Sequence, residues 1–179
     1  MSNVKYFLRI TLTLLIITAV MAAALAAVNG FTAPMIAKLQ EEKTQKAVEL
    51  VLPGGGEAIE FTDPTGLVST VYASETGYAV EVNPVGFDNT ITMMVGINKA
   101  GEVLGISIIS HTETAGLGAV AAADNAAGEA FRGQFVGMSG TLAVSKDGGA
   151  VDSITGATIT SRAICNGINA ALACVGDLG

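Results

Sequence analysis

Nineteen consecutive residues, Ile10–Val28, are far more apolar than the rest of this chain of 179 residues, because 16 of them are apolar and the other three are threonines. As a helix this run is roughly 28 Å long, which matches the hydrocarbon thickness of a bilayer. A cleaved signal peptide is the alternative, since Lys5 and Arg9 precede the run and Ala23–Ala27 offers small residues for cleavage. The apolar part of a signal peptide usually has about 7 to 15 residues. The longer run therefore favours a membrane anchor at residues 1–30, with the run as its single span.

Basic residues are distributed unevenly about this run. Lys5, Arg9 and the amino terminus precede it, whereas the first basic residue after it is Lys38. Because cytoplasmic flanks carry the excess of Lys and Arg, we expect a single-pass protein of the cell (inner) membrane, with its amino terminus in the cytoplasm and its main domain outside. All 16 acidic residues follow the run, and the formal net charge is -7. An acidic outer domain gains no attraction to anionic headgroups, so contact with membrane lipid rests on the helix, and nucleic acid is excluded as a partner.

The remaining chain has the periodicity of a mixed α and β protein. Residues 31–54 contain an amphipathic pattern at Met35–Leu52, which predicts a linker helix that Pro53 and three glycines end. Residues 55–179 form the predicted extracytoplasmic domain. Its strand-like runs, separated by Gly, Asn, Asp and Pro, are Leu67–Ala73, Tyr78–Val82, Ile91–Ile97, Val103–Ile109 and the short Leu142–Ser145. Helices are predicted at Ala119–Phe131 and Ser161–Val175, so the fold class is α+β, with a mixed, largely antiparallel sheet and flanking helices.

Residues that usually carry catalysis are scarce. The chain has one histidine, His111, and it contains none of the common hydrolase, metalloenzyme or nucleotide-binding motifs. Cys165 and Cys174 lie nine residues apart in one predicted helix, which places them on opposite faces and about 13.5 Å apart along its axis. They cannot form a disulfide with each other there. We interpret both as helix packing residues, and His111 as a structural residue at the end of its strand.

Two glycine-rich polar segments remain as candidate sites. The first, His111–Gly118, leaves a strand and enters a helix, and a connection capped by threonine is the simpler interpretation. The second, Asp152–Ser161, runs directly into the terminal helix, where Thr160 or Ser161 can cap it. Free N–H groups and the positive end of a helix dipole favour an anionic phosphate at such a place. A cap alone does not explain five hydroxyl residues among the nine positions 153–161.

Both segments resemble signatures of one family. Ser153–Thr160 is similar to the flavinylation motif of FMN-binding domains, which reads Ser or Thr, then Gly-Ala-Thr, any residue, and Ser or Thr. These domains occur in the G subunit of the Rnf electron-transport complex and in the C subunit of the sodium-pumping NADH:quinone oxidoreductase. Glu113–Gly118 is similar to the second signature, ETPGLG, with Ala115 in place of the usual proline, which loosens one backbone torsion. The resemblance covers nearly the whole chain, and the short chain and its Gly86–Met94 stretch favour the Rnf protein.

The resemblance implies a covalent cofactor. In this family the threonine of Gly-Ala-Thr, here Thr158, is joined to FMN through a phosphoester, and the second signature lies close to the flavin. The other cofactor-binding candidates are Thr155, Gly156, Ala157, Thr160, Ser161, Thr114, Gly116 and Leu117. A threonine hydroxyl is a poor nucleophile unaided, and no His or Lys is adjacent to Thr158 in the sequence. A separate flavin transferase is therefore implied, which in the family uses FAD and magnesium.

Three charged residues lie within or beside these segments. Arg162 either pairs with the phosphate or lies on a solvated helix face. Asp152 either orients the acceptor hydroxyl or is an exposed turn carboxylate. Glu113 is a weaker candidate for contact with the flavin ring, because its charge would oppose a reduced flavin anion.

The resemblance implies a membrane-anchored redox subunit, which is not a complete enzyme alone. It would relay electrons in an Rnf-type ion-translocating ferredoxin:NAD oxidoreductase complex, with other membrane subunits as partners. A single span without an intramembrane acidic residue cannot form the ion path, which we assign to those partners. The alternatives are a subunit of a related quinone reductase, a stand-alone extracytoplasmic FMN carrier, and, from another class, an anchored module that binds an anionic ligand without flavin.

Overall fold

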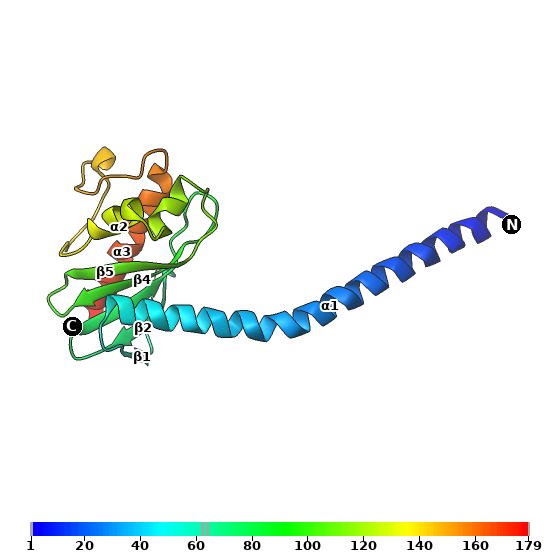
Figure 1. Ribbon diagram of the computed structural model, residues 1–179, viewed down its shortest axis with the longest axis horizontal. Helices are drawn as coiled ribbons and strands as arrows, with labels where there is room; N and C mark the ends of the chain where they lie inside the picture. The colour runs from blue at the N-terminus through cyan, green and yellow to red at the C-terminus, as the bar shows by residue number, and fades with distance from the viewer. Residues whose placement is uncertain (1, 62, 64, 179) are drawn as a thin grey trace. The chain divides into compact units, whose positions relative to one another are not determined.

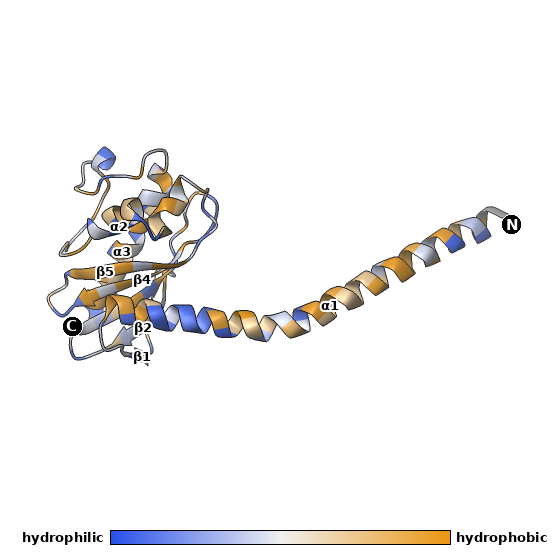
Figure 2. Ribbon diagram, viewed as in Figure 1, coloured by the Kyte–Doolittle hydropathy of each residue, from blue (hydrophilic) through white to orange (hydrophobic). Residues whose placement is uncertain are grey.

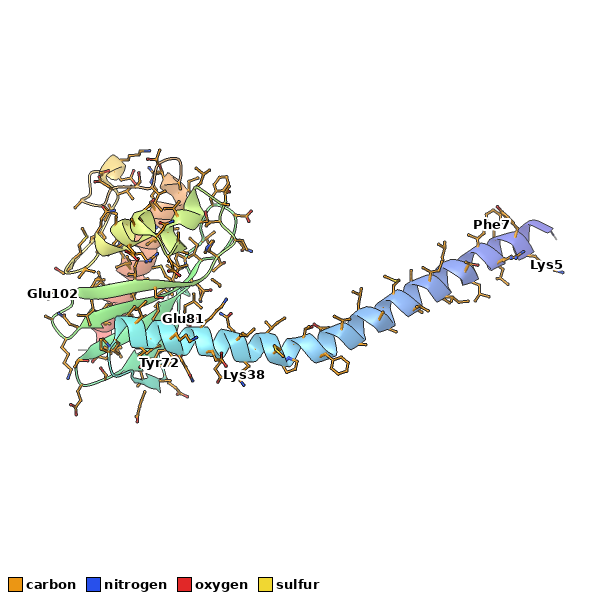
Figure 3. The ribbon with its side chains drawn as sticks, in the orientation of Figure 1. Lys5, Phe7, Lys38, Tyr72, Glu81 and Glu102 are labelled. Carbon is orange, nitrogen blue, oxygen red and sulfur yellow. The ribbon has the colours of Figure 1, made fainter. Side chains whose placement is uncertain are left out.

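The computed structural model describes residues 2–61, 63 and 65–178, and the chain divides between Glu42 and Lys43 into two compact units. The first unit consists of helix α1 (Ser2–Val51) up to Glu42. Among the described helices, α1 is the one that is long and apolar enough to cross a membrane. Figure 2 shows its apolar colour along most of this unit, and Figure 3 labels Lys5 and Lys38 on either side of the apolar run.

Helix α1 is continuous where the sequence predicts a span followed by a separate linker helix. Pro34 lies inside it and lacks the N–H that would donate to the carbonyl of Gly30. One missing hydrogen bond does not end the helix, which continues to Val51 before Pro53 and the glycines. Its last turns, from Lys43 onward, belong to the second compact unit.

The second unit is built on a five-stranded antiparallel sheet in which every strand pairs with its neighbours in the chain (Figure 1). The strands are β1 (Glu57–Ile59), β2 (Val68–Ala73), β3 (Gly77–Val82), β4 (Thr92–Asn98) and β5 (Val103–Ser110). The four longer strands confirm the predicted runs to within one residue at each end. Strand β1 was missed because three residues are too few to show alternation, and it is ordered by pairing with β2.

Each face of the sheet packs against a different helical element. Helix α3 (Thr158–Leu178) and helix α2 (Ala126–Gly133) contribute to the main core, in which Val80 and Val95 are fully buried. The last turns of α1 cover the opposite face and form a second, smaller core with residues that include Ala79 and Met94. The alternation of adjacent residues such as Ala79 and Val80 between the two cores is the period-2 pattern of a strand.

The second core requires a glycine. A Cβ on Gly96 would lie 2.2 Å from the carbonyl oxygen of Val51, so only glycine lets the end of α1 approach β4 this closely.

Two ionisable residues, Tyr72 and Glu81, lie on the same face of the sheet, and both are labelled in Figure 3. Burial raises the pKa of Glu81, and burial together with the Glu81 charge raises the pKa of Tyr72.

Of two predicted elements after the sheet, the helix is correct in part and the strand is wrong. The helix predicted at Ala119–Phe131 is divided into a 3-10 helix, η1 (Gly118–Ala122), and α2, because Asn125 accepts hydrogen bonds from the amides of Ala127 and Gly128 and so starts a new helix. The strand predicted at Leu142–Ser145 is an isolated bridge between Val144 and Val151, followed by the short 3-10 helix η2 (Ser145–Asp147).

Helix α3 is longer than predicted, and it begins three residues earlier, at Thr158 instead of Ser161. Both cysteines lie on it, buried and unpaired, which confirms their interpretation as packing residues. Burial raises the pKa of the Cys165 and Cys174 thiols to about 11. Neither thiol is therefore a nucleophile at neutral pH.

Candidate functional site

The two glycine-rich segments, far apart in the sequence, meet at one cavity of about 250 Å³. One wall comes from the loop after β5 and the other from the start of α3. The lining residues are Phe87, Glu113, Thr114, Leu117, Gly118, Gly156, Ala157, Thr158, Ile159 and Thr160. The cavity thus joins the two segments that the sequence singled out.

The start of α3 supplies hydrogen-bond donors to this cavity. Among the residues that the structure describes, the backbone N–H groups of Thr158, Ile159 and Thr160 donate no hydrogen bond within the chain, whereas that of Ser161 donates to the carbonyl of Ala157 at 3.0 Å. These three N–H groups lie at the positive end of a helix of 21 residues. The arrangement suits a phosphate group.

The capping role predicted for Thr160 or Ser161 is wrong, because both lie inside the first turn of α3. The buried Ser161 hydroxyl donates to the Ala157 carbonyl and accepts from the Ile154 amide, both at 3.0 Å. Ser161 therefore holds the loop that precedes the helix. Gly156 has φ +77° in that loop, and a Cβ there would lie 3.0 Å from the Leu117 side chain, so both backbone conformation and close packing favour glycine.

Glu113 lines the cavity and joins three segments there. One carboxylate oxygen, Oε1, accepts from the backbone N–H of Phe87 at 2.8 Å, and the other, Oε2, accepts from the Thr160 hydroxyl at 2.6 Å. The side chain is buried, and a Cβ on Gly118 would lie 2.4 Å from Oε2. Glu113 thus connects its own loop to the turn at Phe87 and to the first turn of α3. The sequence suggested only a weak ring contact, since nothing in it pairs position 113 with 160.

His111 follows the last residue of β5, as predicted for a structural residue. Its Nδ1 accepts a hydrogen bond from the backbone N–H of Glu113 at 3.2 Å. This bond fixes the backbone of the loop just before the cavity.

The structure brings Lys146 to Thr158, which sequence reasoning missed. The ammonium nitrogen of Lys146 donates to Thr158 Oγ1 at 2.9 Å. Lys146 lies twelve residues before Thr158, on η2, so it is not adjacent to Thr158 in the sequence. Only the fold of the intervening loop brings the two together, so no local motif could have found this contact.

Arg162 is engaged by a neighbour. Its guanidinium donates two hydrogen bonds to the carboxylate of Asp147, each at 2.6 Å. The hydrogen bond from Arg162 lowers the pKa of Asp147. Arg162 therefore ties η2 to α3, and neither of the two predicted interpretations included this ion pair.

Asp152 is exposed. Its backbone N–H donates to the Gln134 side chain at 2.8 Å, and its carbonyl accepts from the same side chain at 3.2 Å.

The predicted cofactor residues fall into three places. Those that line the cavity are Thr114, Leu117, Gly156, Ala157, Thr158 and Thr160. Gly116 and Thr155 line an adjacent open groove, and Ser161 is buried beneath the loop. Sequence reasoning missed Phe87 and Ile159, two largely exposed apolar residues at the cavity. Large exposed apolar side chains beside a pocket are a signal of ligand binding that only a structure supplies.

These residues fit FMN in kind. The N–H groups at the start of α3, with the Lys146 ammonium beside Thr158, suit a phosphate. The apolar side chains of Phe87, Leu117 and Ile159 line the cavity and suit a flat aromatic ring. Gly118 and Gly156 leave backbone uncovered at its wall. Such a set matches a ligand with one anionic and one apolar end.

Comparison with known proteins agrees with this chemistry. Residues 86–173, which include both segments, match the FMN-binding domain family. The G subunit of the ion-translocating oxidoreductase complex of Methanosarcina acetivorans is 31% identical over 185 residues, with 96% of each chain covered. The G subunit of the Na(+)-translocating ferredoxin:NAD(+) oxidoreductase complex of Acetobacterium woodii is 32% identical, with 92% of this chain and 89% of the relative covered. The proton-translocating counterpart of Clostridium ljungdahlii is also 32% identical, with 83% and 80% covered. The chain therefore belongs to the family of G subunits of Rnf-type ion-translocating oxidoreductase complexes and carries the FMN-binding domain of that family.

Proposed function

We propose that this chain carries FMN covalently on Thr158 and relays electrons as the membrane-anchored G subunit of an Rnf-type ferredoxin:NAD oxidoreductase complex. One observation carries the proposal. Thr158 is the first residue of α3, it lines the cavity where both family signatures meet, and the N–H groups around it have no partner among the described residues. A phosphoester on the Thr158 hydroxyl would place an anionic phosphate among those donors.

The chain's own residues would hold and orient the cofactor. FMN supplies the electron transfer when bound, and the protein contributes binding, orientation and electrostatics. The N–H groups of Thr158, Ile159 and Thr160 would bind the phosphate. Phe87, Leu117 and Ile159 would shield the ring from water. Glu113 would keep these walls in register by its bonds to Phe87 and Thr160.

A covalent bond would serve a cofactor outside the cytoplasm. A noncovalent FMN that dissociates there is not replaced from a cytoplasmic pool, and a phosphoester to Thr158 removes that loss. Attachment would need the flavin transferase that the family resemblance implies. A lysine ammonium that donates to Thr158 Oγ1 is not a base toward that oxygen, so the Lys146 contact does not replace this enzyme.

The anchor and the partners follow from α1 and from the relatives. The apolar part of α1 would span the cell membrane, contact its lipid, and leave the FMN domain outside, in keeping with Lys5 and Arg9 at the amino-terminal end. The relatives named for sodium and for proton translocation are equally similar to this chain, at 32% identity. No acidic residue precedes Glu41 in α1. The ion path and the choice of ion would therefore lie in other membrane subunits of the complex.

The test is the intact mass of the chain isolated from its native membranes. We expect an increment of one FMN less water, and Thr158→Ala should abolish both the increment and the ultraviolet fluorescence of the denatured protein in a gel. Thr141→Ala is the matched control, because Thr141 is exposed and lies away from the cavity. An unmodified native mass would favour an anchored module for an anionic ligand, and a fluorescent band in Thr158→Ala would refute the linkage.

Purification distinguishes the complex from a stand-alone carrier. We expect the chain, solubilised in mild detergent, to copurify with several multi-span membrane subunits. Recovery of the flavinylated chain alone would favour an independent FMN carrier and overturn the assignment to a complex.

A further inference from the structure

Lys146 contacts the proposed acceptor residue, Thr158, from outside both glycine-rich segments. Lys146 Nζ lies 2.9 Å from the hydroxyl oxygen that is the proposed acceptor. The two residues belong to different elements, η2 and α3, so the contact is a product of the tertiary fold. A hydrogen bond from a cation to this particular oxygen points to a role in the modification itself.

The position of Lys146 is fixed by its neighbour in the sequence. Asp147, the next residue, accepts two hydrogen bonds from Arg162, which lies one turn after Thr158 on α3. A bidentate pair of this kind has a defined geometry. It holds η2 against the first turn of α3 and thereby holds the backbone of Lys146 beside Thr158.

Within residues 2–61, 63 and 65–178, the charge of the Lys146 ammonium is not paired with a carboxylate, so this ammonium can bind an anion. The carboxylate of Asp147 is occupied by Arg162, and among the described residues Lys146 forms no salt bridge. In the part of the chain that the structure describes, the Lys146 ammonium forms one hydrogen bond, which it donates to the Thr158 hydroxyl. A phosphate on Thr158 would bring an anion to within reach of this ammonium.

We propose that Lys146 is a positioning residue for flavinylation, in that its ammonium orients the Thr158 hydroxyl and then pairs with the phosphate that this hydroxyl receives. This inference rests on the proposed linkage at Thr158. In the step, the Thr158 Oγ–P bond forms and the P–O–P bond of FAD breaks. The hydroxyl proton leaves to a base of the transferase, and AMP is the leaving group. Lys146 neutralises the negative charge on the attacked phosphoryl group and takes no proton.

Kinetics of flavinylation test the role. The full chain in detergent is mixed with flavin transferase, FAD and magnesium, and the initial rate of flavin incorporation is followed by gel fluorescence. We expect Lys146→Met to lower the rate at saturating acceptor chain about tenfold, because losing one hydrogen bond from a charged donor raises the barrier by about 1.4 kcal/mol, the low end for such bonds. Lys146→Arg should restore most of the rate, and Lys146→Glu should lower it further than Lys146→Met does.

Two controls separate positioning from other effects. Lys99→Met removes an exposed lysine from the turn between β4 and β5 and should leave the rate unchanged. The thermal midpoint of Lys146→Met should match that of the unchanged chain, because the contact is exposed. A fall in midpoint that parallels the loss of rate, with no rescue by arginine, would reduce Lys146 to a structural residue and overturn the inference.

The kinetic split decides between positioning and docking. Orientation of the acceptor hydroxyl predicts a lower kcat with a nearly constant KM for the acceptor chain. A change confined to KM would make Lys146 a contact for the transferase, and equal rates in Lys146→Met and the unchanged chain would also refute the proposal. Failure of the underlying linkage has a different signature, since the unchanged chain would then carry no FMN on Thr158 whatever residue occupies position 146.

Discussion

Replacing Glu113 should loosen the cavity before it affects any other part of the fold. In Glu113→Ala the Phe87 amide and the buried Thr160 hydroxyl, now 2.8 and 2.6 Å from the two carboxylate oxygens, lose their acceptor. A donor left without a partner costs about 1 to 3 kcal/mol, with the partly buried Phe87 amide at the low end of that range and the buried Thr160 hydroxyl near its middle. Both donors together give a loss of about 3 kcal/mol in the free energy of unfolding, or about 10 °C in thermal midpoint for a domain of this size.

Glu113→Gln is the matched control. The amide keeps one oxygen as acceptor for Phe87, and its NH₂ group can donate to the Thr160 oxygen. We expect a loss of about 1 kcal/mol, because a neutral hydrogen bond replaces a charge-assisted one. Scanning calorimetry of the full chain in detergent measures both variants, and the sharp transition of the sheet domain is the signal to follow.

A double-mutant cycle with Thr160→Val isolates one of the two bonds. Val is close to Thr in volume, and Glu113→Ala removes the carboxylate without replacing it by another hydrogen-bonding group. The cycle of Glu113→Ala with Thr160→Val therefore reports mainly the coupling between the two side chains, because the loss at Phe87 is the same on both sides of the cycle. We expect a coupling of about 1 kcal/mol. The reasoning fails if Glu113→Ala melts within about 1 °C of the unchanged chain, or if Glu113→Gln is as damaging as Glu113→Ala, which would point to charge instead of hydrogen bonding.

Two further predictions concern ionisable groups away from the cavity. Burial acts to raise the pKa of Asp63, but hydrogen bonds from the Thr65 hydroxyl and from nearby backbone N–H groups outweigh it and lower the pKa to about 2. A carboxyl with a depressed folded pKa stabilises the fold above its unfolded pKa near 3.8 and loses that contribution as the pH falls toward 2. Urea unfolding should therefore show Asp63→Asn to be less stable than the unchanged chain at pH 6, with the difference closing between pH 4 and 2; a constant difference would contradict the assignment. Cys165 and Cys174, with pKa values raised by burial to about 11, should resist maleimide at pH 7.5 in the native chain and both react in urea, as intact mass will show. Labelling of the native chain within minutes would mean that α3 opens readily.

The sequence predicted best those elements whose structure depends on their own local residue pattern. Strands β2 to β5 follow from alternation and from the turn residues between them, and the apolar helix follows from its composition. The division between η1 and α2 was not predicted, because Ala119–Phe131 reads as a good helix and Asn125 acts only through a local cap. Local propensity is a weak guide where a cap competes with it.

The sequence predicted the two segments that meet at the cavity, including the proposed acceptor Thr158, but it did not predict the contacts that support them. Thr158 and the two segments came from motifs that are contiguous in the sequence. The bond between Glu113 and Thr160 spans 47 residues, and the Lys146 contact depends on the ion pair between Asp147 and Arg162. No periodicity or spacing encodes such pairs, since they exist only after the loops have packed.

The order of the strands bears on when the cofactor can be attached. Every pairing in the sheet joins strands adjacent in the chain, so the sheet has mostly local contacts and can assemble early. Thr158 lies after all five strands, and its surroundings also require Glu113 and Lys146 from earlier segments. A nascent or truncated chain that lacks a docked α3 would thus present no acceptor. If Thr158 carries the proposed linkage, flavinylation would act as a checkpoint that marks only those copies whose folding has been completed.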